Sequence, residues 1–573
     1  MKLGNMLLSK VHEKRDIERS IERIRNSYSP NRVLESIPEG NPAARCDNGT
    51  FVGKIVDNVA EYKGIPFAKA PVGPLRWKRP EAPDSDSGIY EAFHNGKSPI
   101  QTEWETERAS YYRQGEDCLC LNIWTGASDG PKDKTVMVFF HGGSYGWGGT
   151  ADPLYDGRVF ASLHPDVVLV TAAYRIGIMG FIDFSEVPGG EDFRDAPNLG
   201  LLDQIEALRW IKKNIRSFGG DPDNVTVFGE SAGGGSVSLL PIISEAKGLF
   251  RRVIAESGSV ALTFSKEECL PFTRKFLAES GAKNMNDLMA LTEKEIMQIN
   301  EKLNMYNNFP ERDGRIIPTD PYSAYDKGIS ADIDMMIGTN ANEMNYWVGE
   351  VGGIIPYRFG IPVKFENDMK ILSRSDKKAL ETFMNHHHGH SIWRMSEYYN
   401  EIMFRLPAIR QAESHSRNGG KVYMYYWAKP SAIRYRGACH AVELSYVFGN
   451  IDETIYTGER SDPELAELVM QMWVNFAKTG NPSVGELVWA PYSENDRATM
   501  VIEESPHLQR DILDDQRRLL MPITRHMINA SYAEIDYNVP FTRRAILFGT
   551  LAAGALIAGG VLLVRSILKG TGK

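Results

Sequence analysis

The sequence is poor in cysteine, in basic runs and in an N-terminal hydrophobic region. It holds 5 cysteines in 573 residues, and this odd, sparse number indicates no disulfide framework. The formal net charge is −9 and no stripe or long run of Lys and Arg is present, which argues against nucleic-acid binding. Among the first ten residues the longest apolar run is Met6-Leu7-Leu8, which is too short for the hydrophobic core of a secretory signal. We therefore expect a protein that is not secreted and is not stabilised by disulfide bonds.

One long uncharged run is present near the C-terminus, from Ala545 to Val564. Its 20 residues are mostly apolar, Arg543-Arg544 precede it, and further basic residues follow it. This length and these flanks predict a single-pass transmembrane helix that anchors the chain by its tail, with the remainder on the cytosolic side of the endoplasmic reticulum or another organelle. Small residues within the run offer a face for helix packing, so a homodimer is allowed.

The other end of the chain is densely charged. Between Lys10 and Ser29, the apolar residues Ile17, Ile21 and Ile24 recur at helical spacing. This pattern predicts a short amphipathic helix that lies on the main domain or on a partner.

Three continuous apolar stretches indicate buried strands: Val136–Phe140, Val167–Tyr174 and Val225–Phe228. Strands without polar alternation are covered on both faces, as in mostly parallel sheets flanked by helices. Residues Leu201–Phe218 carry the helical period between the second and third stretch. The residues therefore predict an α/β fold.

The third strand runs directly into Gly229-Glu230-Ser231-Ala232-Gly233 and then into small and apolar residues. This is the G-x-S-x-G pattern of a nucleophile elbow, a sharp turn between strand and helix that exposes a serine hydroxyl. The helix that follows supplies free N–H groups and a positive dipole end. Ser231 is therefore the predicted nucleophile.

A second G-x-S-x-G is centred on Ser144 and also follows a strand-like run. The residues after it, Trp147 to Thr150, are typical of a loop and offer no helix to stabilise an anion. We interpret Ser144 as part of a loop and not as a nucleophile.

Several further segments, taken in order, resemble the type-B carboxylesterase and cholinesterase family over roughly Cys46 to Tyr492. The matching segments are Gly64–Trp77, Glu116–Asn122, His141-Gly142-Gly143, Asn198–Gln204, Phe218–Pro222, the elbow at Ser231, and Trp473–Gly480. The resemblance implies an α/β-hydrolase fold, with a large mixed and mostly parallel sheet between helices. Together with the predicted anchor it divides the chain into a charged helical extension (1–45), an α/β-hydrolase domain (46–540) and a membrane anchor (541–573).

A serine nucleophile needs a base, and the base needs a group that fixes its tautomer; in this fold the order is Ser, acid, His. The histidines after Ser231 are His386, His387, His388, His390, His415, His440, His507 and His526. His440 opens an apolar segment from a loop of small residues, whereas the cluster from His386 to His390 has no spaced carboxylate and is typical of an exposed loop more than of a metal site. His440 also matches the family's G-x-x-H-x-x-E motif, which implies that it is the base.

Glu343 is the predicted acid. It lies in the loop after the strand-like Asp334–Gly338, where functional residues of open α/β sheets gather. Many other carboxylates occur between serine and histidine, and the choice depends on the family's G-x-N-x-x-E motif.

By role, the N–H groups of Gly142, Gly143 and Ala232 are the predicted oxyanion hole. The resemblance also places Glu230 near the leaving group. Ser144 stands where the family usually has a third glycine.

The resemblance thus implies a serine carboxylesterase, acting through an acyl-enzyme on Ser231 upon esters of small molecules or lipids, with amides and thioesters as further substrates. It calls for no cofactor and no metal. Two alternatives stay open: an acyltransferase that uses the same triad, and a non-catalytic, neuroligin-like adhesion protein.

Overall fold

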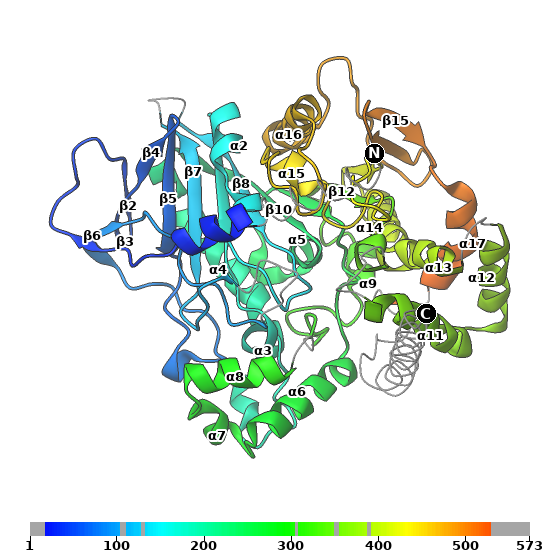
Figure 1. Cartoon of the computed structure of the whole chain (residues 1–573), viewed down its shortest axis with the longest axis horizontal. Coiled ribbons are helices and arrows are strands. Elements are labelled where there is room, and N and C mark those ends of the chain that lie inside the picture. The colour runs from blue at the N-terminus through cyan, green and yellow to red at the C-terminus, as the bar shows by residue number, and fades with distance from the viewer. Residues whose placement is uncertain are drawn as a thin grey trace, which may run out of the picture.

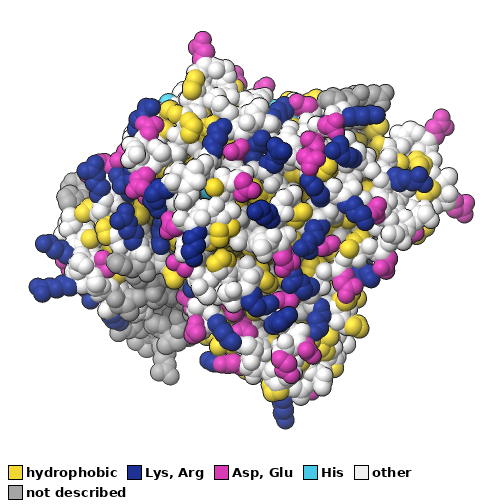
Figure 2. All heavy atoms as spheres, turned by 180° about the vertical axis from the view of Figure 1, so that it is seen from behind, with side chains coloured by type: hydrophobic (Ala, Val, Ile, Leu, Met, Phe, Trp, Pro, Cys, Tyr) yellow, Lys and Arg dark blue, Asp and Glu magenta, His cyan; other side chains and the backbone are white. Residues whose placement is uncertain are grey.

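The computed structural model describes residues 18–102, 111–127, 132–303, 308–348, 355–386, 391–525 and 527–528 (Figure 1). Its centre is an 11-stranded sheet, and a 4-stranded sheet lies at the N-terminal side. Acidic and basic side chains are interspersed over the back of the molecule (Figure 2).

The large sheet is parallel through its middle and antiparallel at both ends. β8, β9, β10, β11, β12, β13 and β14 pair in parallel, whereas β7, β5, β4 and β15 join in antiparallel fashion. In spatial order its strands are β15 (His507–Arg510), β14 (Ala498–Ile502), β13 (Val422–Trp427), β12 (Asp334–Asn340), β11 (Arg252–Glu256), β10 (Gly220–Glu230), β8 (Lys134–Phe140), β9 (Val167–Ala172), β7 (Cys120–Gly126), β5 (Val59–Pro66) and β4 (Lys54–Val56).

The small sheet and the helices complete the fold. The small sheet has the order β1 (Val33–Leu34), β6 (Asp86–Glu91), β3 (Asn48–Val52) and β2 (Ala43–Cys46). The α-helices with defined bounds are α2 (Arg158–Leu163), α3 (Gly177–Gly180), α4 (Leu199–Asn214), α5 (Ala232–Leu239), α6 (Lys266–Ser280), α7 (Met285–Met289), α8 (Glu293–Leu303), α9 (Pro321–Asp326), α10 (Asn345–Val348), α11 (Ile355–Ile371), α12 (Arg374–His386), α13 (Ser391–Asn400), α14 (Leu406–Arg417), α15 (Leu444–Val447), α16 (Pro463–Thr479) and α17 (Asp514–Thr524).

Both faces of the large sheet are buried, which explains why its strands lack polar alternation. On β8, Val136 and Val138 belong to the core that also contains α4 and α14, whereas Met137 and Phe139 belong to the core beneath α2, α15 and α16. The predicted α/β-hydrolase architecture is confirmed. The first and third predicted strands lie within β8 and β10, and the second, Val167–Tyr174, extends two residues beyond the end of β9 at Ala172.

The predicted fold class is wrong on one point, the C-terminal transmembrane helix. No helix in the described part of the chain is long and apolar enough to cross a bilayer, and Ala545–Val564 lies outside the described residues. An apolar run of sufficient length allows a membrane-spanning helix but does not establish that one forms. The three domain boundaries, the cytosolic location and the homodimer stay predictions.

The predicted N-terminal helix is seen over residues 18–26, and residues 1–17 lie outside the description. Ile24 on this helix is fully buried, whereas Glu18, Arg19 and Glu22 are exposed. The helix therefore lies on the main domain, which is the first of the two positions expected from the sequence.

Candidate active site

Ser231 stands at a sharp turn between β10, which ends at Glu230, and α5, which begins at Ala232. Its backbone is strained, with φ 56° and ψ −117°, as a nucleophile elbow requires. The flanking glycines are needed for space: a Cβ on Gly233 would lie 1.9 Å from the carbonyl oxygen of Phe140. Ser144 also has a positive φ of 50°, but no α-helix follows it before α2.

The candidate residues come from neighbouring parallel strands. Gly142 follows β8, Ser231 follows β10, Glu343 follows β12 and His440 lies in the long connection after β13. Because these strands are parallel and adjacent, their carboxyl ends bring residues far apart in the sequence to one edge of the sheet.

Glu343 and His440 form the central pair of the site. His440 Nδ1 lies 2.7 Å from Glu343 Oε2, and the Glu343 side chain is fully buried. The other oxygen, Oε1, accepts hydrogen bonds from Ser257 Oγ (2.6 Å) and from the backbone N–H of Asn340 (2.7 Å). A carboxylate held at both oxygens can fix the orientation and tautomer of the imidazole.

The opposite nitrogen of the ring faces the elbow. His440 Nε2 lies 3.1 Å from Glu230 Oε1, on the residue immediately before Ser231. The Ser231 hydroxyl makes no hydrogen bond to any other described residue. Hydrogen bonds between nucleophile and base are often long in unliganded enzymes and tighten when substrate binds.

Two neighbouring aromatic rings pack against the imidazole. The ring centroids of Trp347 and Phe404 lie 5.0 Å and 5.1 Å from that of His440, and the two aromatic rings stack on each other. Neither residue was predicted from the sequence, and Ser257 was not predicted either. Trp347 follows Glu343 by four positions, which was the available signal.

Two more buried carboxyl groups lie behind the pair. Burial raises the pKa of Glu256 to about 8, and Trp473 Nε1 donates a hydrogen bond of 2.5 Å to it. Burial, together with the charges of Glu230 and Glu343, raises the pKa of Glu443 well above its usual range, and Asn340 Nδ2 donates to it at 2.6 Å. Glu443 is the last letter of the G-x-x-H-x-x-E motif, to which the sequence analysis gave no role.

The loop after β8 carries the predicted oxyanion donors Gly142 and Gly143. Gly143 has a φ of 101°, and no described acceptor takes the N–H groups of Gly142, Gly143 or Ala232. Burial lowers the pKa of the preceding His141 to about 4, so its ring is neutral near pH 7. His141 Nδ1 lies 2.8 Å from the carbonyl oxygen of Gly142, and Tyr174 stacks on the ring. The loop therefore offers N–H groups without a described acceptor, and the His141 side chain at its start is held in place.

The remaining candidate histidines lie elsewhere. His415 is buried between Ser330 and the carbonyl of Ile333, and His507 is exposed. His386 ends α12, whereas His387, His388, His390 and His526 lie outside the described residues. Among the described residues, no group of three or more His, Cys, Asp or Glu side chains is placed to hold a metal ion.

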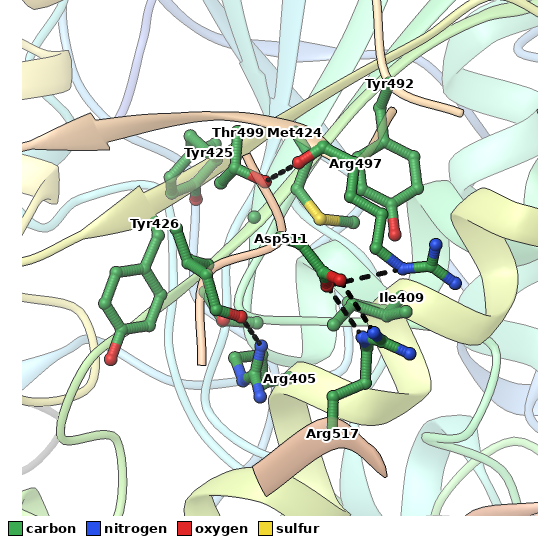
Figure 3. Close-up of a pocket in the computed structure, with 14 residues that line it drawn as sticks. Arg405, Ile409, Met424, Tyr425, Tyr426, Tyr492, Arg497, Thr499, Asp511 and Arg517 are labelled. Atoms are coloured by element: carbon green, nitrogen blue, oxygen red, sulfur yellow. Dashed lines mark hydrogen bonds and ion pairs between the residues drawn. The ribbon is translucent and has the colours of Figure 1, made fainter. Parts of the chain in front are cut away.

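A separate pocket lies between α14, α17 and strands β12 to β14 (Figure 3). Its polar lining consists of ion pairs: Asp511 binds Arg517 through both oxygens, and Arg497 Nε lies 3.5 Å from the same carboxylate. Arg405 is held by Glu401. These charges are paired with each other, and the pocket contains none of the predicted site residues.

The chain as a whole is similar to known esterases. A family model described as the carboxylesterase family matches residues 41–519. The para-nitrobenzyl esterase of Bacillus subtilis (strain 168) is 34% identical over 83% of this chain and 97% of its own. Neuroligin-2 of Mus musculus is 27% identical, covering 83% of this chain and 66% of its own. The crystal structure of the Geobacillus stearothermophilus carboxylesterase EST55 superposes with a TM-score of 0.76 at 30% identity, covering 83% of this chain and 99% of that one.

Proposed function

The chain belongs to the carboxylesterase family, and from this premise we propose that Ser231, His440 and Glu343 carry out its hydrolysis of carboxylic esters. Ser231 Oγ attacks the ester carbonyl while His440 Nε2 takes the hydroxyl proton. The tetrahedral intermediate then expels the alcohol, which receives that proton from His440. Water, deprotonated by His440, attacks the acyl-serine, and the carboxylic acid leaves as Ser231 regains its proton.

The observation that carries this proposal is the position of the His440 ring. Glu343 lies behind it at 2.7 Å from Nδ1, while Nε2 points to the elbow that holds Ser231. A base must be fixed at one nitrogen and open toward the nucleophile at the other. Glu230, 3.1 Å from Nε2, is then close to the departing alcohol.

The oxyanion is assigned to the N–H groups of Gly142, Gly143 and Ala232. Their lack of protein acceptors among the described residues supports this role, since donors aimed at the developing charge must be available when it forms. The expected substrates are esters of small molecules or lipids.

Labelling with a fluorophosphonate probe tests the assignment. The wild type should form a covalent adduct and hydrolyse p-nitrophenyl acetate, and Ser231→Ala should lose both. Ser144→Ala, the matched variant at the second G-x-S-x-G, should still be labelled. If the Ser231→Ala variant is still labelled by the probe, the proposal is wrong.

Acyl transfer is the alternative that uses the same residues. It differs only at the second step, where another alcohol or amine replaces water. Product analysis with p-nitrophenyl acetate and added alcohols distinguishes the two, because a transferase gives the new ester in excess over acetate. A non-catalytic adhesion role is disfavoured, because serine, acid and base are all retained.

A further inference from the structure

The N-terminal arm, defined here as residues 18–32, lies ahead of residue 41, where the family match begins. It is not a loose extension, because residues 18–26 form a helix against the domain, drawn in dark blue in Figure 1. Ser20 Oγ and Arg23 Nη1 each donate a hydrogen bond of 2.6 Å to the Glu453 carboxylate. The arm therefore has a defined position.

Ile24 is the apolar anchor of the arm. Its side chain is fully buried in a small cluster separate from the two main cores. The other members of this cluster are Tyr112 and Ala151, with Tyr28, Tyr111 and Trp147 packed against them. Trp147 and Ala151 belong to residues 147–152, the downstream half of the loop that carries Gly142 and Gly143.

Trp147 and Gly143 form one tight turn. The N–H groups of Gly146 and Trp147 both donate to the carbonyl oxygen of Gly143, at 2.9 Å and 3.0 Å. A Cβ on Gly143 would lie only 2.1 Å from the Trp147 carbonyl oxygen, so no space separates the two residues. A shift of Trp147 must therefore move the peptide of Gly143.

Tyr28 extends the contact from the arm to the same loop. Its hydroxyl lies 3.1 Å from Ser98 Oγ, and that oxygen lies 2.5 Å from the place a Cβ on Gly149 would occupy. Gln101, three residues after Ser98, exchanges two hydrogen bonds with the backbone of Gly148. The arm thus supports the loop through the apolar cluster of Ile24 and, from Tyr28, by way of Ser98.

The arm also makes polar contacts with the domain. Besides the contacts with Glu453, Asn31 Nδ2 donates to the carbonyl oxygens of Lys63 and His94. Beside the arm lies a cavity of about 420 Å³, bordered on the arm side by Arg19, Glu22, Arg23, Asn26 and Ser27. The polar contacts lie outside the apolar cluster of Ile24, so they keep the arm docked but do not replace the packing of Ile24. Removing the Ile24 side chain should release the loop more than it disturbs the domain.

We propose that Ile24 and Tyr28 are positioning residues for the oxyanion hole, acting through Trp147 and Ser98 on the loop that bears Gly142 and Gly143. This inference rests on the proposed function, because an oxyanion hole matters only if Ser231 attacks an ester carbonyl. The arm is then a part of the catalytic apparatus that the family match does not include.

The test compares Ile24→Ala with Arg32→Gln in the full chain. Arg32 lies at the base of the same arm and is ion-paired with Glu91, away from the loop, so Arg32→Gln perturbs the arm without touching the cluster. Ile24→Ala should lower kcat for p-nitrophenyl acetate by roughly 10- to 100-fold, with KM changed less than about twofold, because a small displacement of oxyanion donors acts on the transition state. Arg32→Gln and the conservative Ile24→Val should stay within about twofold of the wild type.

Rates are expressed per fluorophosphonate-titrated site, so that unfolded protein does not count. A trifluoromethyl ketone, which forms an oxyanion with the serine, should lose affinity for Ile24→Ala by the same factor as kcat/KM. If Ile24→Ala does not fold, Tyr28→Phe takes its place, with an expected loss of about two- to tenfold from one hydrogen bond.

An unchanged kcat per site, or an unchanged ketone affinity, in a folded Ile24→Ala overturns the positioning role and leaves the proposed function standing. A rise in KM alone also overturns it. A wild type that neither takes up the probe nor hydrolyses the ester overturns the proposed function itself.

Discussion

Two carboxylates and two aromatic rings surround much of the His440 imidazole. Glu343 holds Nδ1, Glu230 faces Nε2, and Trp347 and Phe404 pack against the ring. Fixed charges and rings reduce the reorganisation needed when the imidazole becomes charged. Nε2 must exchange Glu230 for the substrate's oxygen during the reaction, so the two carboxylates differ in role although both lie within hydrogen-bond distance.

Glu343→Gln should lower kcat by roughly 10³- to 10⁴-fold, because an amide at this position can donate to Nδ1 and select the wrong tautomer. The fold should persist, since the amide matches the carboxylate in size. Steady-state kinetics per titrated site measure the effect. Glu504→Gln, on a side chain that is 66% exposed, is the control and should be indistinguishable from the wild type.

Glu256→Gln should change how stability depends on pH. The pKa of Glu256 in the folded chain is raised to about 8 from an ordinary 4.5, so its proton is retained on folding. The stability this group contributes is complete below pH 4.5 and is lost as the pH rises through about 8. Glutamine has no proton to lose, so the variant's Tm should fall less between about pH 5 and pH 9.

The exposed Glu39→Gln is the control for that series and should keep the wild-type slope of Tm against pH. A Glu256→Gln profile parallel to the wild type would show that this carboxyl does not titrate as described.

At the scale of elements, the two G-x-S-x-G turns lead into different structures. The turn at Ser231 enters α5 at once, whereas the loop after β8 bends back so that Trp147 donates to Gly143. In the proposed function one pattern supplies the nucleophile and the other the donor loop, and both lie at the ends of neighbouring strands.

Gly143→Ala should lower kcat by about 10²-fold. Its φ of 101° disfavours a side chain, and the added methyl would lie 2.1 Å from the Trp147 carbonyl oxygen, so the loop must move. Gly40→Ala is the matched control, because Gly40 also has a positive φ, of 80°, with no atom within 4 Å of the added Cβ. Equal activity loss in both variants would contradict a role for the loop position.

The sequence predicted the features that local pattern determines. The elbow, the strands and the loops of Glu343 and His440 lie in short segments with their own turn chemistry, and the structure brings these segments to one edge of the sheet. Ser257 and Phe404 were missed because their contacts with the site join segments with no common pattern, whereas Trp347 lies only four positions after Glu343. The helix ending at Phe218 was also imperfect, because α4 stops at Asn214 and a 3₁₀ turn comes after it.

For the whole molecule, the ion pairs of Figure 3 fasten the last described helix to the sheet. Asp511 precedes α17 and binds Arg517 on it, while Arg497 comes just before β14. The ion pairs around the pocket therefore stabilise the packing of α17 on the sheet, and they have no part in the proposed esterase site.

Asp511→Asn should destabilise the chain by about 1–2 kcal/mol, because the partly buried Arg517 loses its counter-charge, whereas Arg497 keeps its ion pair with Glu413. Thermal unfolding should show a lower Tm, with kcat per titrated site unchanged. Asp514→Asn, which breaks an ion pair with the exposed Arg518 at the start of α17, should leave Tm nearly unchanged. A fall in kcat for Asp511→Asn would contradict the separation of these ion pairs from the site.

The order of strands in the large sheet also has a consequence for synthesis. The central strands β8 to β11 come from the first half of the chain, while the connection with His440 and the neighbouring β13 and β14 come much later. A nascent chain that has been synthesised as far as Ser231 does not yet contain His440. Prematurely terminated chains should therefore be inert toward esters, and the reactive centre can appear only when the C-terminal half has been added.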